Sequence, residues 1–71
     1  MEDLVVILAE YEGSEVVSET TMRTFGEREE TEQHAQGLAR TLTEKKSRRV
    51  IVKTVRPTSR DEKTLIPVYW Q

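Results

Sequence analysis

The distribution of apolar and polar residues predicts strands near the start of the chain and after its middle. Leu4 to Ala9 (LVVILA) is a continuous apolar run rich in β-branched residues, which predicts a buried strand from Leu4 to Tyr11. Glu15 to Met22 is β-prone but polar, and Gly13 lies in the turn between the two segments. We therefore expect a hairpin whose second arm is exposed. A later β-branched run, Arg49 to Arg56 (RVIVKTVR), predicts a third strand.

Between the hairpin and the third strand, the apolar positions have helical spacing. Thr24 and Glu27 fit a capping box, in which each side chain bonds the backbone amide of the other, so the helix is expected to begin near Phe25 to Glu27. Lys45 and Lys46 suit the negative end of the helix macrodipole and mark the expected last turn. One apolar stripe follows the helix at three- and four-residue intervals and suits packing on a sheet: Thr31, Ala35, Leu38, Ala39 and Leu42.

The last apolar segment, Thr64 to Trp70 (TLIPVYW), predicts a fourth strand. Pro67 cannot donate a backbone hydrogen bond, which places this strand at an edge of the sheet. With strands numbered along the chain, the order 2-1-3-4 makes every neighbouring pair antiparallel and puts the two most apolar strands at the centre. The expected fold class is α+β: a single ββαββ domain over residues 1–71, with a four-stranded antiparallel sheet and one helix packed on one face.

The predicted sheet has more apolar surface than one helix can cover. One helix shields only one face, yet the first strand is apolar on both sides. The third strand is expected to turn Val50, Val52 and Thr54 toward the helix. In one interpretation, Tyr69 and Trp70 complete the core and the rest is ordinary surface. In the other, which we prefer, the uncovered face binds another protein or a second copy of the chain through these residues: Val5, Ile7, Ile51, Lys53, Val55 and Trp70.

Charge is divided unevenly along the chain, although the formal net charge is only -2. Residues 1–44 hold eleven acidic and three basic residues, whereas residues 45–71 hold eight basic and two acidic ones. The basic run at the end of the helix suggests an alternative function, nucleic-acid binding through phosphate contacts: Lys45, Lys46, Arg48 and Arg49. An isoelectric point near 5.4 argues against this alternative, because nucleic-acid-binding domains are usually basic.

The sequence offers little support for catalysis or ligand binding. His34 is the only histidine and has no evident nucleophile or carboxylate partner, and the three glycines are too scattered for a phosphate loop. We expect no enzyme activity, cofactor, metal or small-molecule ligand. The start of the chain is acidic rather than basic, no run approaches the roughly 20 apolar residues of a membrane span, and cysteine is absent. These features predict a cytoplasmic protein, and the uncovered apolar face predicts a non-catalytic interaction module, such as a small regulator, adaptor or inhibitor. It would bind through the open face or an edge strand, including as a homodimer.

Overall fold

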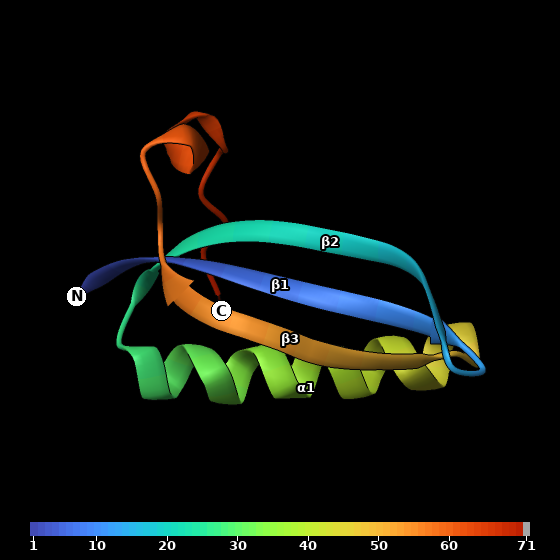
Figure 1. Cartoon of the computed structure of the whole chain (residues 1–71). Coiled ribbons are helices and arrows are strands. Elements are labelled where there is room, and N and C mark those ends of the chain that lie inside the picture. The colour runs from blue at the N-terminus through green and yellow to red at the C-terminus, as the bar shows by residue number, and fades with distance from the viewer. Residues whose placement is uncertain (71) are drawn as a thin grey trace.

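The computed structural model describes residues 1–70 and begins with the expected hairpin (Figure 1). Strand β1 spans Glu2–Glu12 and strand β2 spans Glu15–Gly26. Gly13 in the turn has a φ of 63°, a left-handed conformation that glycine adopts without steric cost. Both strands are longer than predicted, because the antiparallel ladder continues until Glu2 pairs with Gly26. The hairpin prediction is therefore confirmed, and its bounds were too short.

Helix α1 spans Arg28–Lys46, and its end at Lys45 and Lys46 is as predicted. The predicted capping box is wrong, because Glu27 is the N-cap residue and no side chain caps the helix. Thr24 instead lies within β2, where it pairs with Leu4 and is fully buried. Strand pairing up to Gly26 holds Thr24 away from the helix start, which overrides the local capping signal. Ser47, with a φ of 55°, ends the helix.

Strand β3 spans Arg49–Pro57 and completes a three-stranded antiparallel sheet in the order β2-β1-β3. The most apolar strand, β1, is central as predicted. Helix α1 packs on one face of the sheet, mainly against β3 and then β1 (Figure 1). The predicted apolar stripe of the helix is buried or partly buried there, and the core joins three strand residues to two helix residues: Val6, Leu8, Val50, Ala35 and Ala39.

The predicted fourth strand is not present in the structure. The chain instead forms a short 3₁₀ helix, η1 (Asp61–Thr64), and then an extended segment that reaches β2 rather than β3. The amide of Val68 donates to the carbonyl oxygen of Arg23 at 2.6 Å, and Pro67 forms one parallel bridge with Arg23. Pro67 has no amide hydrogen to continue such a ladder, which helps to explain why pairing ends there. The order β2-β1-β3 thus agrees with the prediction, without its fourth member.

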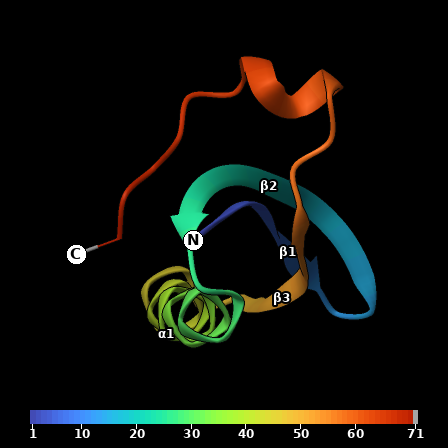
Figure 2. The same cartoon turned by 90° about the vertical axis from the view of Figure 1, so that its left-hand side faces the viewer.

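The segment from Thr58 to Trp70, here called the strap, wraps around the sheet (Figure 2). It crosses the face opposite α1, passes the outer edge of β2, and ends near the helix. Trp70 packs against the core cluster, with its ring centroid 5.8 Å from that of His34. Because α1 lies mainly under β3 and β1, Trp70 covers part of the core that the helix leaves open.

A β-bulge at Lys53 changes which residues of β3 face the helix. Ile7 pairs with Thr54 and the next residue of β1, Leu8, pairs with Val52, so Lys53 has no partner in the ladder. Val55 consequently packs on the helix side, and Thr54 lies opposite Ile7 on the open side. The simple alternation expected from the sequence is therefore wrong beyond Lys53.

Candidate protein-binding surface

The sheet face opposite α1, here called the open face, is divided into two parts by the strap. Alternation along β1 places Val5, Ile7 and Ala9 on this face, because Val6 and Leu8 are in the core on the helix side. The strap covers the part around Val5, here called the strap end. The part from Ile7 toward the β1–β2 turn is here called the hairpin end.

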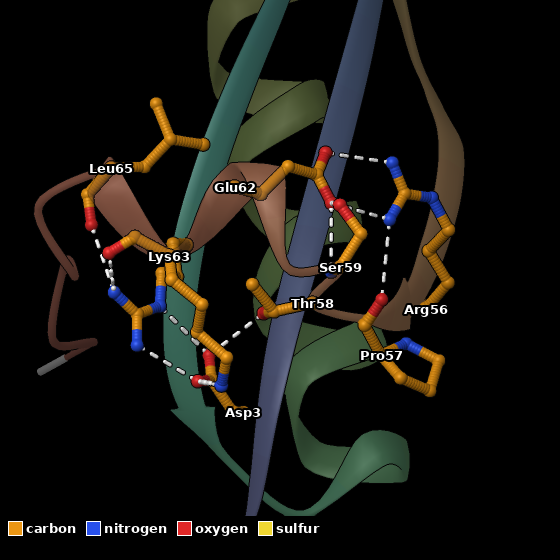
Figure 3. Close-up of polar contacts among 9 residues, drawn as sticks. Asp3, Arg56, Pro57, Thr58, Ser59, Glu62, Lys63 and Leu65 are labelled. Carbon is orange, nitrogen blue, oxygen red and sulfur yellow. Dashed lines mark hydrogen bonds and ion pairs between the residues drawn. The ribbon is translucent and has the colours of Figure 1, made fainter.

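Asp3 is the main polar anchor at the strap end (Figure 3). Its carboxylate accepts two hydrogen bonds from the Arg23 guanidinium, at 2.9 and 2.8 Å, and one from the Thr58 hydroxyl at 2.7 Å. It also forms an ion pair with Lys63. These donors, Arg23 first and then Lys63, hold the pKa of Asp3 far below its ordinary range. The backbone contributes as well, since the Thr58 amide donates to the Asp3 carbonyl at 2.9 Å.

Arg56 and Glu62 form a second anchor of the strap (Figure 3). The guanidinium of Arg56 binds both carboxylate oxygens of Glu62, at 2.7 and 2.8 Å. Ser59 donates from its amide and its hydroxyl to the same carboxylate. The Arg56 contact first, and then Ser59, lower the pKa of Glu62 from its ordinary 4.5 to about 2. Beneath these two anchors Val5 is fully buried.

The hairpin end is exposed and carries an apolar group of side chains. Tyr11 pairs with Val16 in the ladder, so both lie on the open face with Ile7 and Ile51. Val16 is 47% exposed and Ile51 is 37% exposed. The guanidinium carbon of Arg49 lies 4.5 Å from the Tyr11 ring centroid, a cation–π contact. We call these five residues the hairpin-end patch.

One ion pair crosses the open face beside this patch. The Lys53 ammonium lies 2.6 Å from the Glu19 carboxylate, although the two residues are on opposite outer strands. Hydrogen bonding to Glu19 raises the pKa of Lys53. Ala9, which pairs with Glu19 and lies between the two strands, is fully buried.

The structure brings together only some of the predicted binding residues. Ile7 and Ile51 lie on the hairpin end, and Lys53 reaches over the same face to Glu19. Val5 lies under the strap, and Val55 and Trp70 pack on the helix side. Sequence reasoning missed three members of the hairpin-end patch: Tyr11, Val16 and Arg49. The sequence did contain a signal for Tyr11 and Val16. The alternation of the first strand continues past Ala9 to Tyr11, and pairing across the Gly13 turn places Val16 beside it.

The basic run proposed for nucleic-acid binding is partly occupied by internal ion pairs. Lys46 and Arg48 each lie 3.0 Å from the carboxylate of Glu10, and together, Lys46 first, they lower its pKa. Arg48 also lies 3.6 Å from Glu12. Arg49 stacks on Tyr11, and Lys45 is exposed at the end of α1. Two of the four cations are thus neutralised by carboxylates of β1.

Two further features of the described residues bear on ligand binding. Within residues 1–70, no three His, Asp or Glu side chains converge in a way that could hold a metal ion. A cavity of about 240 Å³ lies between the start of α1 and the strap; Phe25, His34, Tyr69 and Trp70 are among its lining residues, with the carboxylates of Glu27 and Glu30.

Comparisons with protein families, curated proteins and solved structures gave no match for this chain. In the described part of the chain, no helix has the length and apolar character needed to cross a membrane. The hairpin-end patch is therefore described by its own geometry, with Val16 and Ile51 exposed beside Tyr11.

Proposed function

We propose that this protein is a non-catalytic binding module, a small regulator, adaptor or inhibitor, that binds another protein through the hairpin-end patch. One observation carries the proposal. The chain covers the strap end of its own open face but leaves Ile51 and Val16 exposed beside Tyr11 at the other end. Contiguous exposed apolar surface is typical of association sites. We place this activity in the cytoplasm, where a chain without cysteine is compatible with reducing conditions.

The composition of the patch supports protein recognition. Tyrosine and arginine are enriched among residues that dominate binding energies, and here Arg49 holds the Tyr11 ring from one side. The ion pair between Lys53 and Glu19 supplies charged groups beside the apolar centre, as the polar rim of an interface does. The patch is small, so the complex that we propose is of the transient class.

The test is affinity capture from an extract of the source organism with three forms of the chain. Ile51→Glu places a charge in the patch, and Gln36→Glu places the same charge on the exposed side of α1 as a control. A specific partner should be retained by the unmodified chain and by Gln36→Glu, and lost with Ile51→Glu. Titration calorimetry with the purified partner should repeat this order. Equal retention by all three forms would contradict the proposal.

Nuclease treatment of the same extract tests the alternative function. Binding through Lys45, Lys46, Arg48 and Arg49 requires partners that disappear with the nucleic acid and with rising salt. The pairing of Lys46 and Arg48 with Glu10 weakens this alternative, because those cations are already neutralised. Under our proposal, nuclease leaves the captured partner in place.

A further inference from the structure

The two outer edges of the sheet differ in how their backbone groups are used. At β3, the Val50 amide donates to the Thr43 hydroxyl at 2.9 Å; that hydroxyl lies 2.8 Å from the Ala39 carbonyl oxygen, to which it donates, and 3.2 Å from that of Val50. The backbone amide and carbonyl of Val50 therefore point away from β1, and the Thr43 hydroxyl of α1 lies against both of them. Farther along, Lys53 forms a bulge and Pro57 has no amide hydrogen. A bulge, a lysine and a proline are typical protections of an edge strand, so the β3 edge is unsuited to further pairing.

Among the described residues, the edge of β2 is blocked at its two ends and free between them. The Arg23 carbonyl points outward, because it accepts from the Val68 amide of the strap. Outward-pointing residues alternate along a strand, so Thr21 and Glu19 also present their amide and carbonyl groups outward. Val17 forms a bulge in the β1–β2 ladder, which bends the strand at that point. Between the bulge and the strap lies a free edge, Ser18–Met22, without proline or lysine.

We propose that this free edge pairs with the same edge of a second copy of the chain, antiparallel and with Thr20 opposite Thr20. The centre of Ser18–Met22 is Thr20, so a two-fold axis there uses the whole free edge. Glu19 then lies opposite Thr21 of the second copy, and the outward groups of both residues meet as hydrogen-bonded pairs. Opposed threonines are favourable cross-strand neighbours. This arrangement is isologous and closes as a dimer.

Other registers are less favourable for reasons that the structure supplies. An axis at Glu19 places two carboxylates directly opposite each other, which is destabilising. An axis at Thr21 requires the outward groups of Arg23, and the strap already uses its carbonyl. The pairing centred on Thr20 avoids both problems.

Exposed apolar residues at the two ends of the free edge also support a second copy as the occupant. In the proposed register, the pairing ends with Ser18 of one copy opposite Met22 of the other, because the strand bulges at Val17 and the strap is docked at Arg23. Val17 is 43% exposed, and Val68 of the strap is 44% exposed. The proposed pairing places Val17 of one copy next to the docked strap of the other, at both ends of the free edge. The product is a continuous six-stranded sheet with both helices on one face.

This dimer uses the edge of β2 and not the hairpin-end patch, so it goes beyond the proposed function and can fail separately. The test uses the absence of cysteine from the chain. Thr20→Cys places two thiols across the axis at a separation that suits a disulfide, and should cross-link to itself under mild oxidation. Gln36→Cys, on the exposed side of α1, is the control. Cross-linking of Thr20→Cys no faster than that of Gln36→Cys would overturn the proposal.

Sedimentation equilibrium gives an independent measurement on the unmodified chain, which should show a dimer that dissociates on dilution. Thr21→Pro removes an outward amide without touching the β1–β2 ladder, and should weaken the dimer by about tenfold or more. Thr20→Lys, which opposes two ammonium groups across the axis, should have the same direction of effect if Thr21→Pro does not fold. Ile51→Glu should leave the dimer unchanged. A monomer at every concentration would refute the proposed dimer. Partner binding through the hairpin-end patch is judged separately, by the capture experiment.

Discussion

The two ends of the open face lie on the same strands, but the strap covers one end and leaves the other exposed. At the strap end, Asp3 and Arg56 bind groups of the strap, and Val5 beneath them is fully buried. At the hairpin end, Lys53 and Glu19 bind each other, and Ile51 stays exposed. Apolar residues are present at both ends. The polar partners around them therefore decide which part of the face the chain covers by itself.

This difference also separates stability from recognition. Burial of an apolar side chain stabilises the fold in proportion to the area removed from water, so the strap end should be sensitive to truncation. An exposed apolar side chain contributes little to the folded protomer and is available to a partner. Substitutions at the two ends should therefore have different effects on unfolding and on binding.

The largest effect on stability is expected at Trp70, the last residue of the strap. Trp70→Ala removes the ring that packs against the core cluster and should lower the free energy of unfolding by about 3 kcal/mol. Urea unfolding followed by circular dichroism measures this change. Trp70→Phe is the matched control. The indole amine of Trp70 is buried without an acceptor among the described residues, so losing it costs no hydrogen bond there.

Next in size is the truncation of the valine beneath the strap. Val5→Ala should cost about 2 kcal/mol, because Val5 has no exposed surface and its removal leaves a cavity. The same denaturation experiment applies. A cost near zero would mean that the strap does not cover Val5 in solution, and the contrast between the two ends would disappear.

A smaller, local effect is expected from Asp3→Asn. The substitution removes the charge that Arg23 and Lys63 share, and loosens the strap without opening the sheet. Hydrogen exchange should become about tenfold faster at the amides of Thr58 and Val68, which donate to the carbonyl oxygens of Asp3 and Arg23 in the sheet. Glu29→Gln, on the exposed side of α1, should leave both rates unchanged.

Acid should release the second anchor of the strap. The pKa of Glu62 is depressed to about 2 in the fold, so its pairing with Arg56 stabilises the protein above pH 4.5 and is lost as the pH falls toward 2. Arg23 first, and then Lys63, likewise hold the pKa of Asp3 far below its ordinary range. The NMR shift of the Ser59 amide, which donates to Glu62, should follow this titration. In Glu62→Gln the transition should be absent.

The smallest effect on stability is expected at the hairpin end. Ile51→Thr should change the free energy of unfolding by no more than about 0.5 kcal/mol, because the side chain is already partly in water. Its effect on partner binding should be much larger than its effect on unfolding. A loss of stability comparable to that of Val5→Ala would show that the two ends do not differ as described.

The local patterns in the sequence were sufficient for the three strands, their order and the helix. Leu4 to Ala9 predicted the central strand, and the stripe containing Ala35 and Ala39 predicted the packed side of α1. These features depend on residues near one another in the chain or on simple periodicity. The hairpin-end patch was predicted only in part, through Ile7 and Ile51.

The strap and the bulge could not be predicted because they depend on long-range contacts. Thr58 binds Asp3 across 55 positions, and no local pattern indicates that pairing. The segment from Thr64 to Trp70 has the composition of a strand, but it forms one bridge with β2 and packs Trp70 against the core cluster, while Ile66 and Tyr69 stay exposed. The bulge at Lys53 reversed the side of Val55, since a single extra residue shifts the alternation.

The Asp3 anchor has a consequence for the order in which the protein folds during synthesis. Its partners Thr58 and Lys63 follow it by 55 and 60 residues, so they leave the ribosome after the hairpin, α1 and β3 have been made. Contacts of such high sequence separation slow folding, because a long loop must close before they form. The nascent chain therefore carries Val5 uncovered until Thr58 and Lys63 emerge, and in that interval it depends most on protection from aggregation.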